Sequence, residues 1–201
     1  MIRIVLAEDQ SMLRSALAAL LALEEDMEIV GEAVDGADAM RHVRAQDPDV
    51  LVSDIEMPGM TGLELAASMA RAQLRTRVLI ITTFARHGYV QRAKHLGVHG
   101  YLLKDAPSHE LAEAIRSVAR GERVFDAGQL AGSEALPEDP LSDRDRRILR
   151  LVEQGMTNKE IAEQMNLSPG TVRNYLNETT SKLDASNRIE AFRKARENGW
   201  L

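Results

Sequence analysis

The sequence predicts an α/β domain with a doubly wound, five-stranded parallel sheet, followed by a small all-α domain of four helices. Three observations support this. Five short apolar runs alternate with segments whose apolar residues recur at helical spacing. Residues 126–140 are rich in Gly, Ala, Ser, Pro and acids and lack a sustained apolar period. After them, only helical spacing remains. We therefore expect domains at 1–125 and 141–201, joined by a linker at 126–140.

The first domain alternates strand and helix five times. The strands are expected at 2–7, 28–34, 49–54, 77–83 and 100–104, and the helices at 11–23, 36–46, 62–72, 88–96 and 108–120. Strands that are joined through helices run parallel, so the helices cover both faces of the sheet. We expect the flavodoxin-like strand order 2-1-3-4-5.

The second domain reads as four helices. The first is amphipathic and ends near Gly155, and the second is short, around Ile161. Ser168 and Pro169 are typical of a helix start, as N-cap hydroxyl and first-turn proline. The turn at 166–168 joins the second and third helices, and a fourth runs from about 186 to 198. This arrangement is typical of a helix-turn-helix.

Composition excludes several classes of protein. The 201 residues include 44% hydrophobic residues, enough for a core, and no cysteine. Disulfide scaffolds, thiolate zinc sites and cysteine nucleophiles are therefore excluded. No run approaches the about 18 apolar residues of a membrane span, and Glu8 and Asp9 interrupt any signal-like start. We expect a cytoplasmic protein with no membrane insertion.

Charge is distributed unevenly along the chain, whose net charge is -6. Residues 1–125 hold 14 Lys and Arg against 18 Asp and Glu, and residues 126–140 hold four acids and no base. Residues 141–201 hold 11 bases and nine acids. The C-terminal part is thus mildly basic, which weakly favours a surface for a polyanion.

Polar side chains collect where the predicted strands end. They are Glu8 and Asp9 directly after the first strand, Asp54 at the end of the third, Thr82 and Thr83 at the end of the fourth, and Lys104 at the end of the fifth. The carboxyl ends of parallel strands share one edge, where sites of α/β proteins form. Clustered carboxylates suit Mg²⁺, and a carboxylate can accept a phosphoryl group that a metal and a lysine stabilise. Each residue alone is more often a turn, strand or surface residue, so the hypothesis of a phosphoacceptor at Asp54 depends on their coincidence.

The motifs resemble a two-component response regulator of the NarL/FixJ family, with a receiver and a LuxR-type helix-turn-helix, over nearly the whole chain. The receiver motifs are ED (8–9), DIEMPGMTG (54–62), TT (82–83) and GYLLKD (100–105). The effector motif is LSDRDRRILRLVEQGMTNKEIAEQMNLSPGTVRNYL (141–176). The finer pattern looks most like the DesR-like branch, which would imply control of a membrane-lipid desaturase.

For the receiver, the resemblance implies that a sensor histidine kinase phosphorylates Asp54. It also implies that Mg²⁺ binds Asp9 and Asp54 directly, Glu8 through water and the backbone carbonyl of Glu56. Lys104 would pair with the phosphoryl oxygens. Thr82 would supply the switch hydroxyl, because it lies 22 residues before Lys104, with Thr83 as the alternative, and Tyr101 the coupled aromatic.

For the effector, the resemblance implies that the third helix enters the major groove of promoter DNA. The candidates for base contact are Arg173, Asn174 and Asn177, and those for phosphate contact are Lys159, Thr171 and Lys182. The last helix, with Ile189, Phe192 and Ala195, resembles a dimerisation helix, and the alternative is packing within its own domain. Phosphorylation would drive homodimerisation or release the DNA-binding domain, and RNA polymerase is a further expected partner.

Two other functions compete with this one. A haloacid-dehalogenase-like phosphatase also uses an aspartyl nucleophile and Mg²⁺, but it needs an Asp two positions later, where this chain has Glu56. A transcription factor that works without phosphorylation would not need the complete set of acids, hydroxyl and lysine. We therefore expect a phosphorylated transcription regulator and not an enzyme.

Overall fold

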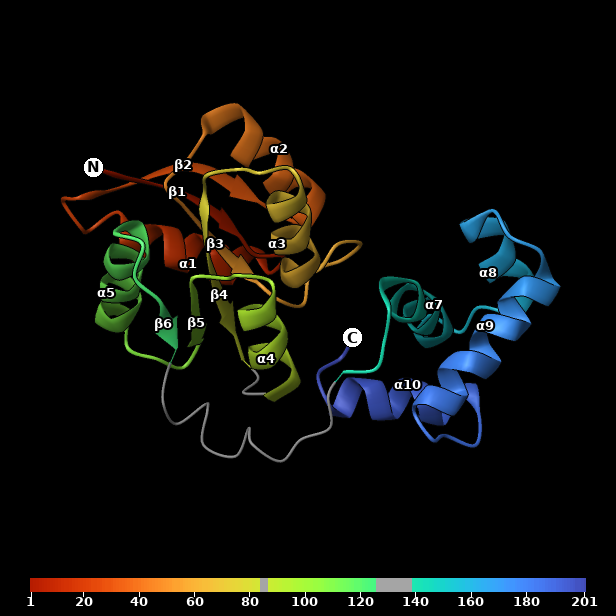
Figure 1. The fold of residues 1–201 in the computed structure, drawn as a ribbon. Helices are drawn as coiled ribbons and strands as arrows, with labels where there is room; N and C mark the ends of the chain where they lie inside the picture. The colour runs from red at the N-terminus through yellow and green to blue at the C-terminus, as the bar shows by residue number, and fades with distance from the viewer. Residues whose placement is uncertain (84–86, 126–138) are drawn as a thin grey trace. The chain divides into compact units, whose positions relative to one another are not determined.

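The computed structural model describes residues 1–83, 87–125 and 139–201, and the chain folds into two compact units (Figure 1). A parallel sheet with its helices forms the first unit, and helices alone form the second. Most of the predicted linker, residues 126–138, lies outside the described residues. The predicted class of each unit is confirmed.

The first unit alternates strands and helices. Its strands are β1 (Ile2–Ala7), β2 (Met27–Ala33), β3 (Val50–Asp54), β4 (Arg77–Thr82), β5 (Gly100–Leu103) and β6 (Val124–Phe125), and its helices are α1 (Ser11–Leu21), α2 (Gly36–Gln46), α3 (Gly62–Arg71), α4 (His87–His95) and α5 (Ser108–Ala119). Within the described residues the order is β2-β1-β3-β4-β5-β6, with every pair parallel. The predicted order is confirmed, and β6 is an added two-residue edge strand that is too short to give a periodic signal.

The sheet lies between two layers of helices. Helices α1 and α5 cover one face, and α2, α3 and α4 cover the other (Figure 1). Every residue of β3 is buried, as expected for a strand with helices on both faces. One core cluster joins Leu6, Val52 and Leu79 of the sheet with Ile115 of α5. The central strands are therefore rigidly held, and their carboxyl ends have defined positions.

The second unit, described without a gap from residue 139, consists of four helices: α7 (Asp143–Glu153), α8 (Asn158–Met165), α9 (Pro169–Lys182) and α10 (Arg188–Glu197). Asn166 adopts the left-handed conformation that ends α8, and the Ser168 hydroxyl accepts a hydrogen bond from the Thr171 backbone N–H at 3.0 Å. Pro169 occupies the first turn of α9. The predicted helix-turn-helix is thus formed by α8 and α9.

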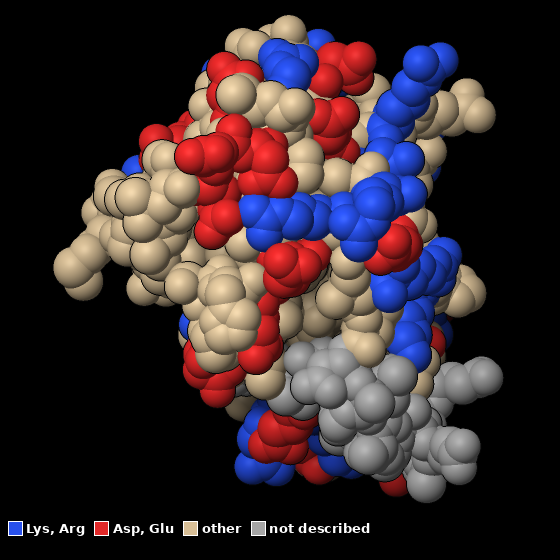
Figure 2. All heavy atoms as spheres, turned by 90° about the vertical axis from the view of Figure 1, so that its left-hand side faces the viewer, with Lys and Arg blue, Asp and Glu red and all other residues tan. Residues whose placement is uncertain are grey.

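Charged side chains of both signs are paired on the surface of the first unit. Arg116 of α5 donates to Asp26 at 2.7 and 2.8 Å and to Glu24 at 2.6 Å. Figure 2 shows one face of the molecule, on which basic and acidic side chains lie next to one another.

Throughout the described residues, each helix is too short or too polar to cross a membrane.

Gly62 couples the start of α3 to the end of β3. Its N–H donates to the Ile55 carbonyl at 3.0 Å and closes the loop that follows Asp54. A Cβ at this position would lie 2.0 Å from the Asp54 carbonyl oxygen and 2.9 Å from the Ser53 hydroxyl. A side chain here must therefore displace backbone next to Asp54.

We predict that Gly62→Ala lowers the free energy of unfolding by about 1–3 kcal/mol, because the added methyl overpacks a buried site. Gly170→Ala is the matched control, since its Cβ would meet no atom closer than 3.7 Å and alanine favours helix. Urea denaturation followed by circular dichroism measures both variants. A Gly62→Ala protein as stable as the parent would contradict this packing.

Candidate functional site

Three carboxylates lie together at the carboxyl edge of the sheet. Glu8 and Asp9 follow β1, and Asp54 ends the neighbouring strand β3. Each offers one oxygen, and these oxygens lie within 4.8 Å of one another. Glu8 and Asp54 are buried, at 0% and 5% exposure, while Asp9 is exposed. The structure thus brings together the acids that the sequence predicted at this edge.

Lys104, which follows β5, links two of these acids. Its Nζ lies 2.7 Å from Glu8 Oε2 and 2.9 Å from Asp54 Oδ2, and its side chain is 7% exposed. The Lys104 N–H donates to the Thr82 carbonyl at 2.8 Å, which anchors the lysine to the end of β4. Three carboxylates accompany this one ammonium, so the group of four side chains keeps an excess of negative charge.

Burial and pairing oppose each other in this cluster. Burial raises the pKa of Asp54 and of Glu8, and the hydrogen bonds from Lys104 offset only part of that increase. Burial alone would lower the pKa of Lys104, but its bonds to the two carboxylates raise it. The lysine therefore stays charged, and it compensates the buried acids incompletely.

Backbone groups orient the carboxylates. The Ile55 N–H donates to Asp54 Oδ1 at 2.7 Å, while Oδ2 faces Lys104. The Gln10 N–H donates to Glu8 Oε1 at 3.3 Å. Glu56, whose carbonyl was predicted to face a metal, lies two residues beyond Asp54 in the loop before α3 and is half-buried. The carboxylates of Glu8 and Asp54 thus have defined directions.

The predicted switch residues lie on β4, which pairs with β3, and on β5, which pairs with β4 on its other side. Thr82 ends β4 and is 1% exposed, and Tyr101 is fully buried in β5, opposite Ile80 in the strand register. Thr83 is exposed. Of the two threonines, Thr82 is therefore the one that is buried at the edge of the sheet where the three acids lie.

In the second unit, the predicted DNA-contacting residues are mostly exposed. Arg173, Asn174 and Asn177 lie on the open side of α9, and Lys159 is exposed near the start of α8. The Thr171 hydroxyl lies 2.8 Å from that of Ser168. Lys182 is also exposed, with 36% of its side chain accessible, but its Nζ lies 2.6 Å from Asp145 Oδ2 and is therefore already paired.

The candidates on α10 face different surroundings. Ile189 is 57% exposed, whereas Ala195 is fully buried beside Leu149 and Trp200. Phe192 is half-buried and packs against both core clusters of this unit. Of the three, Ile189 has the most surface for a partner, and Ala195 packs in the core of its own unit.

Comparison with known proteins identifies both units. Residues 4–116 match the family described as "Response regulator receiver domain", and residues 139–195 match "Bacterial regulatory proteins, luxR family". The chain belongs to the LuxR-family response regulators. Its receiver and its DNA-binding domain make it a transcription regulator of the two-component type.

Relatives match this response regulator over its full length. It is 50% identical to the transcriptional regulatory protein DesR of Bacillus subtilis (strain 168) and 47% identical to the uncharacterized transcriptional regulatory protein YvfU of the same strain, with 100% of each chain covered. The crystal structure of the response regulator ChrA of a heme-sensing two-component system is 34% identical, with a TM-score of 0.58, and the match covers 100% of this chain and 98% of that one.

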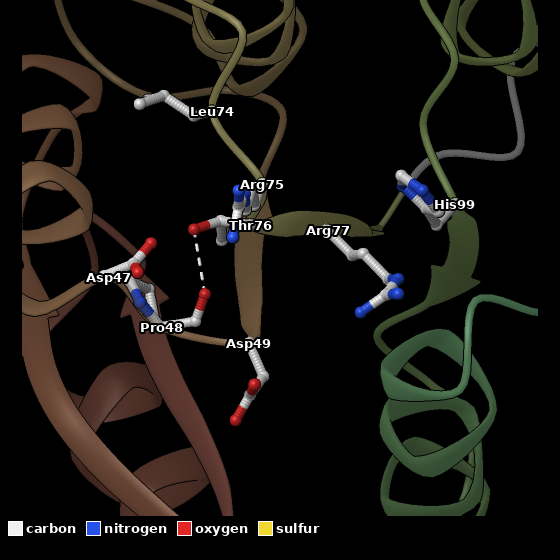
Figure 3. Close-up of a pocket in the computed structure, with 8 residues that line it drawn as sticks. All are labelled: Asp47, Pro48, Asp49, Leu74, Arg75, Thr76, Arg77 and His99. Atoms are coloured by element: carbon white, nitrogen blue, oxygen red, sulfur yellow. Dashed lines mark hydrogen bonds between the residues drawn. The ribbon is translucent and has the colours of Figure 1, made fainter.

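The amino ends of the strands form a second polar region in the response regulator's receiver. A pocket of about 610 Å³ lies there, at the opposite edge from Asp54, between the segments that precede β3, β4 and β5 (Figure 3). The Thr76 hydroxyl donates to the Pro48 carbonyl at 2.8 Å. Burial, with the charges of Arg77 and Arg123, lowers the pKa of His99. This region is separate from the acid cluster.

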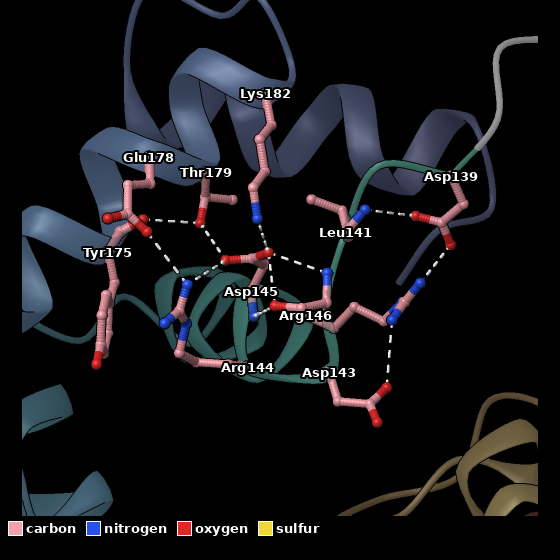
Figure 4. A network of polar contacts seen from close by, with 11 residues as sticks. Asp139, Leu141, Asp143, Arg144, Asp145, Arg146, Tyr175, Glu178, Thr179 and Lys182 are labelled. Carbon is pink, nitrogen blue, oxygen red and sulfur yellow. Dashed lines mark hydrogen bonds and ion pairs between the residues drawn. The ribbon is translucent and has the colours of Figure 1, made fainter.

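Sequence reasoning missed one buried acid of the DNA-binding domain. Asp145 has a fully buried side chain, and donors from α7 and α9 converge on it (Figure 4). The pattern Ser142-x-x-Asp145 is a capping-box signal that could have identified its role at the start of α7. The partners on α9 could not be read from local sequence, because they lie more than 30 residues away.

The pKa of Asp145 is below its usual range. Burial alone would raise it, but hydrogen bonds from Lys182, Ser142 and Thr179 outweigh burial. A carboxyl group with a lowered folded-state pKa stabilises the fold above its unfolded pKa of about 3.9. That contribution is lost as the pH falls toward the folded-state pKa.

We predict that Asp145→Asn lowers the free energy of unfolding of this unit by about 1–3 kcal/mol at pH 7, because charged hydrogen bonds are lost. The difference from the parent should shrink below about pH 4. Urea denaturation between pH 3 and pH 7 measures it. The control is Asp143→Asn, whose side chain is 79% exposed and which should change stability by about 0.5 kcal/mol or less. A loss of unfolding free energy in Asp145→Asn that is equal at pH 3 and pH 7 would contradict this interpretation.

Proposed function

We propose that a sensor histidine kinase phosphorylates Asp54 of this protein in the cytoplasm and that phosphorylation controls its binding to promoter DNA. The observation that carries the proposal is Lys104, which lies between Asp54 and Glu8 at 2.9 and 2.7 Å, with Asp9 alongside. A phosphoacceptor needs a carboxylate, a cation for the phosphoryl oxygens and a metal site, and this edge offers all three. We further propose the receiver at 1–125, the linker at 126–140 and the DNA-binding domain at 141–201.

The donor set suits Mg²⁺. Mg²⁺ prefers oxygen ligands, keeps several waters and binds through one or two carboxylates together with phosphate. We propose that Asp9 and Asp54 would hold it directly, Glu8 through water and Glu56 through its backbone carbonyl. The excess of negative charge around Lys104 supports a divalent cation here. When bound, Mg²⁺ would supply charge stabilisation for the phosphoryl oxygens.

Phosphoryl transfer makes few demands on the protein beyond position and charge. A carboxylate oxygen of Asp54 attacks phosphorus as the bond from phosphorus to the kinase histidine nitrogen breaks, and that nitrogen keeps the bonding electron pair. The Ile55 N–H, at 2.7 Å from Oδ1, orients the carboxylate for attack. Lys104 is already beside Oδ2 and can pair with a transferred phosphoryl oxygen.

The switch follows from the added charge. A phosphoryl group brings roughly two negative charges and strong acceptor oxygens. Its acceptors draw the Thr82 hydroxyl inward, and Tyr101 of the adjacent strand β5 moves into the vacated space. The output of this movement is either homodimerisation or release of the DNA-binding domain. Exposed Ile189 of α10, with half-buried Phe192, is our candidate dimer contact.

The proposed DNA interface is the open side of α9. Arg173 suits guanine and Asn174 and Asn177 suit adenine in the major groove. Lys159 and Thr171 are proposed to contact phosphates from the starts of α8 and α9. RNA polymerase is a proposed partner of the DNA-bound protein.

We predict that Asp54→Ala abolishes labelling by a small phosphodonor such as acetyl phosphate, because the acceptor oxygen is gone. Intact-mass spectrometry should show one phosphoryl group on the parent and none on the variant. Asp143→Ala, which removes an exposed carboxylate of the second unit, should label like the parent. Full labelling of Asp54→Ala would place the acceptor elsewhere.

We predict that Arg173→Ala weakens binding to a cognate promoter by about 1–3 kcal/mol and relaxes the base preference at one position, as expected for loss of a bidentate base contact. Arg147→Ala removes the same charge from an exposed position on α7 and controls for net charge. Fluorescence anisotropy with promoter variants measures both. An unchanged base preference would show that Arg173 contacts no base and is only a solvated side chain of α9.

A further inference from the structure

The Asp145 carboxylate joins the first turn of α7 to the last turns of α9. It accepts hydrogen bonds from the Ser142 N–H at 2.9 Å and the Ser142 hydroxyl at 2.7 Å. It also accepts from the Thr179 hydroxyl at 2.9 Å and the Lys182 ammonium at 2.6 Å. The side chain has no exposed surface, so these four donors replace the water that an ionised carboxylate requires.

The two partners on α9 define how that helix is rotated. Thr179 and Lys182 lie three residues apart, on one side of the helix. Tying both to one carboxylate restrains rotation of α9 about its axis as well as sliding along it. The exposed residues Arg173, Asn174 and Asn177 belong to the same rigid helix. Their direction in a DNA groove therefore depends on the contact with Asp145.

Arg144, next to Asp145 on α7, makes two further contacts with α9. Arg144 of α7 lies with its guanidinium carbon 3.8 Å from the centre of the Tyr175 ring, and its Nη2 is 3.2 Å from Glu178 Oε2 (Figure 4). Arg144 thus neutralises an acid on α9 that would otherwise repel DNA phosphates. Two charged residues of α9 thus form ion pairs with α7: Lys182 with Asp145, and Glu178 with Arg144.

We propose that Asp145 is a positioning residue for DNA reading: through Thr179 and Lys182 it sets the rotation of α9, and Lys182 serves this internal ion pair instead of a DNA phosphate. The proposal rests on the DNA-reading function proposed above for α9. It reassigns Lys182, which the sequence placed among the phosphate contacts. Lys159, which has an exposed side chain near the start of α8, keeps that role.

The salt dependence of binding tests the role of Lys182. Each lysine that contacts a phosphate adds close to one unit to the slope of log affinity against log salt concentration. With the full chain, Mg²⁺ and beryllofluoride, Lys159→Met should reduce the slope by about one. Lys182→Met should leave the slope unchanged while affinity for the cognate fragment falls at every salt concentration. A slope reduced by about one in Lys182→Met would overturn the reassignment.

Selectivity tests the positioning role. The ratio of affinities for a genomic fragment selected by the parent protein and for its shuffled counterpart should fall at least tenfold in Asp145→Asn. Binding to the shuffled fragment should not weaken, because that binding depends on charge. Thr179→Val, which keeps the side-chain shape and removes the hydroxyl, should lower the ratio in the same direction. A purely structural defect would instead weaken both affinities together.

Folding is checked for each variant by circular dichroism at the assay temperature. An unchanged ratio in folded Asp145→Asn would overturn the proposal. If Asp145→Asn does not fold, unchanged ratios in both Thr179→Val and Lys182→Met would overturn it. A parent protein that prefers no fragment would instead contradict the proposed DNA-reading function, so the two failures are distinguishable.

Discussion

The ammonium of Lys104 sits between two buried carboxylates, and the receiver's site depends on that contact. Glu8 and Asp54 end up side by side because β1 and β3 are neighbours in a parallel sheet, and such an arrangement costs free energy unless a cation compensates it. Lys104 reaches both acids because β5 ends at the same edge. One lysine leaves the cluster negative, and this excess of negative charge is the basis for proposing that a divalent cation and a phosphoryl group bind here.

The DNA-binding unit also contains a buried carboxylate, but its charge is compensated in a different way. Asp145 accepts four hydrogen bonds, one of them from the Lys182 ammonium, and its pKa is lowered where that of Asp54 is raised. An acid whose charge is fully compensated has little further affinity for a cation, and its role is to hold two helices together. An acid that is compensated incompletely remains available for chemistry. Burial alone therefore does not distinguish the two carboxylates, but the number of donors does.

The sequence predicted what depends on local pattern and on strand topology. The alternation of strands and helices, the order of the five long strands and the Ser168–Pro169 start of α9 are all confirmed. The meeting of Glu8, Asp54 and Lys104 followed from one rule, that carboxyl ends of parallel strands share an edge. The short strand β6 and the ion pair of Lys182 were not predictable, because each depends on contacts between segments far apart in the chain. For Ala195 the sequence left two alternatives open, and the structure buries it in the core of its own domain. The functional roles of the site residues remain predictions.

Selection of genomic DNA fragments measures directly whether a phosphoryl group at Asp54 controls DNA binding. The purified full chain would be incubated with genomic DNA fragments in Mg²⁺, with and without beryllofluoride as a phosphoryl mimic, and the bound fragments sequenced. If phosphorylation of Asp54 controls DNA binding, a defined set of promoter fragments is enriched only with the mimic. A lipid-desaturase promoter within that set would support the target expected from the DesR-like pattern, and its absence would remove that target. Equal enrichment of the same fragments without the mimic would contradict the central claim.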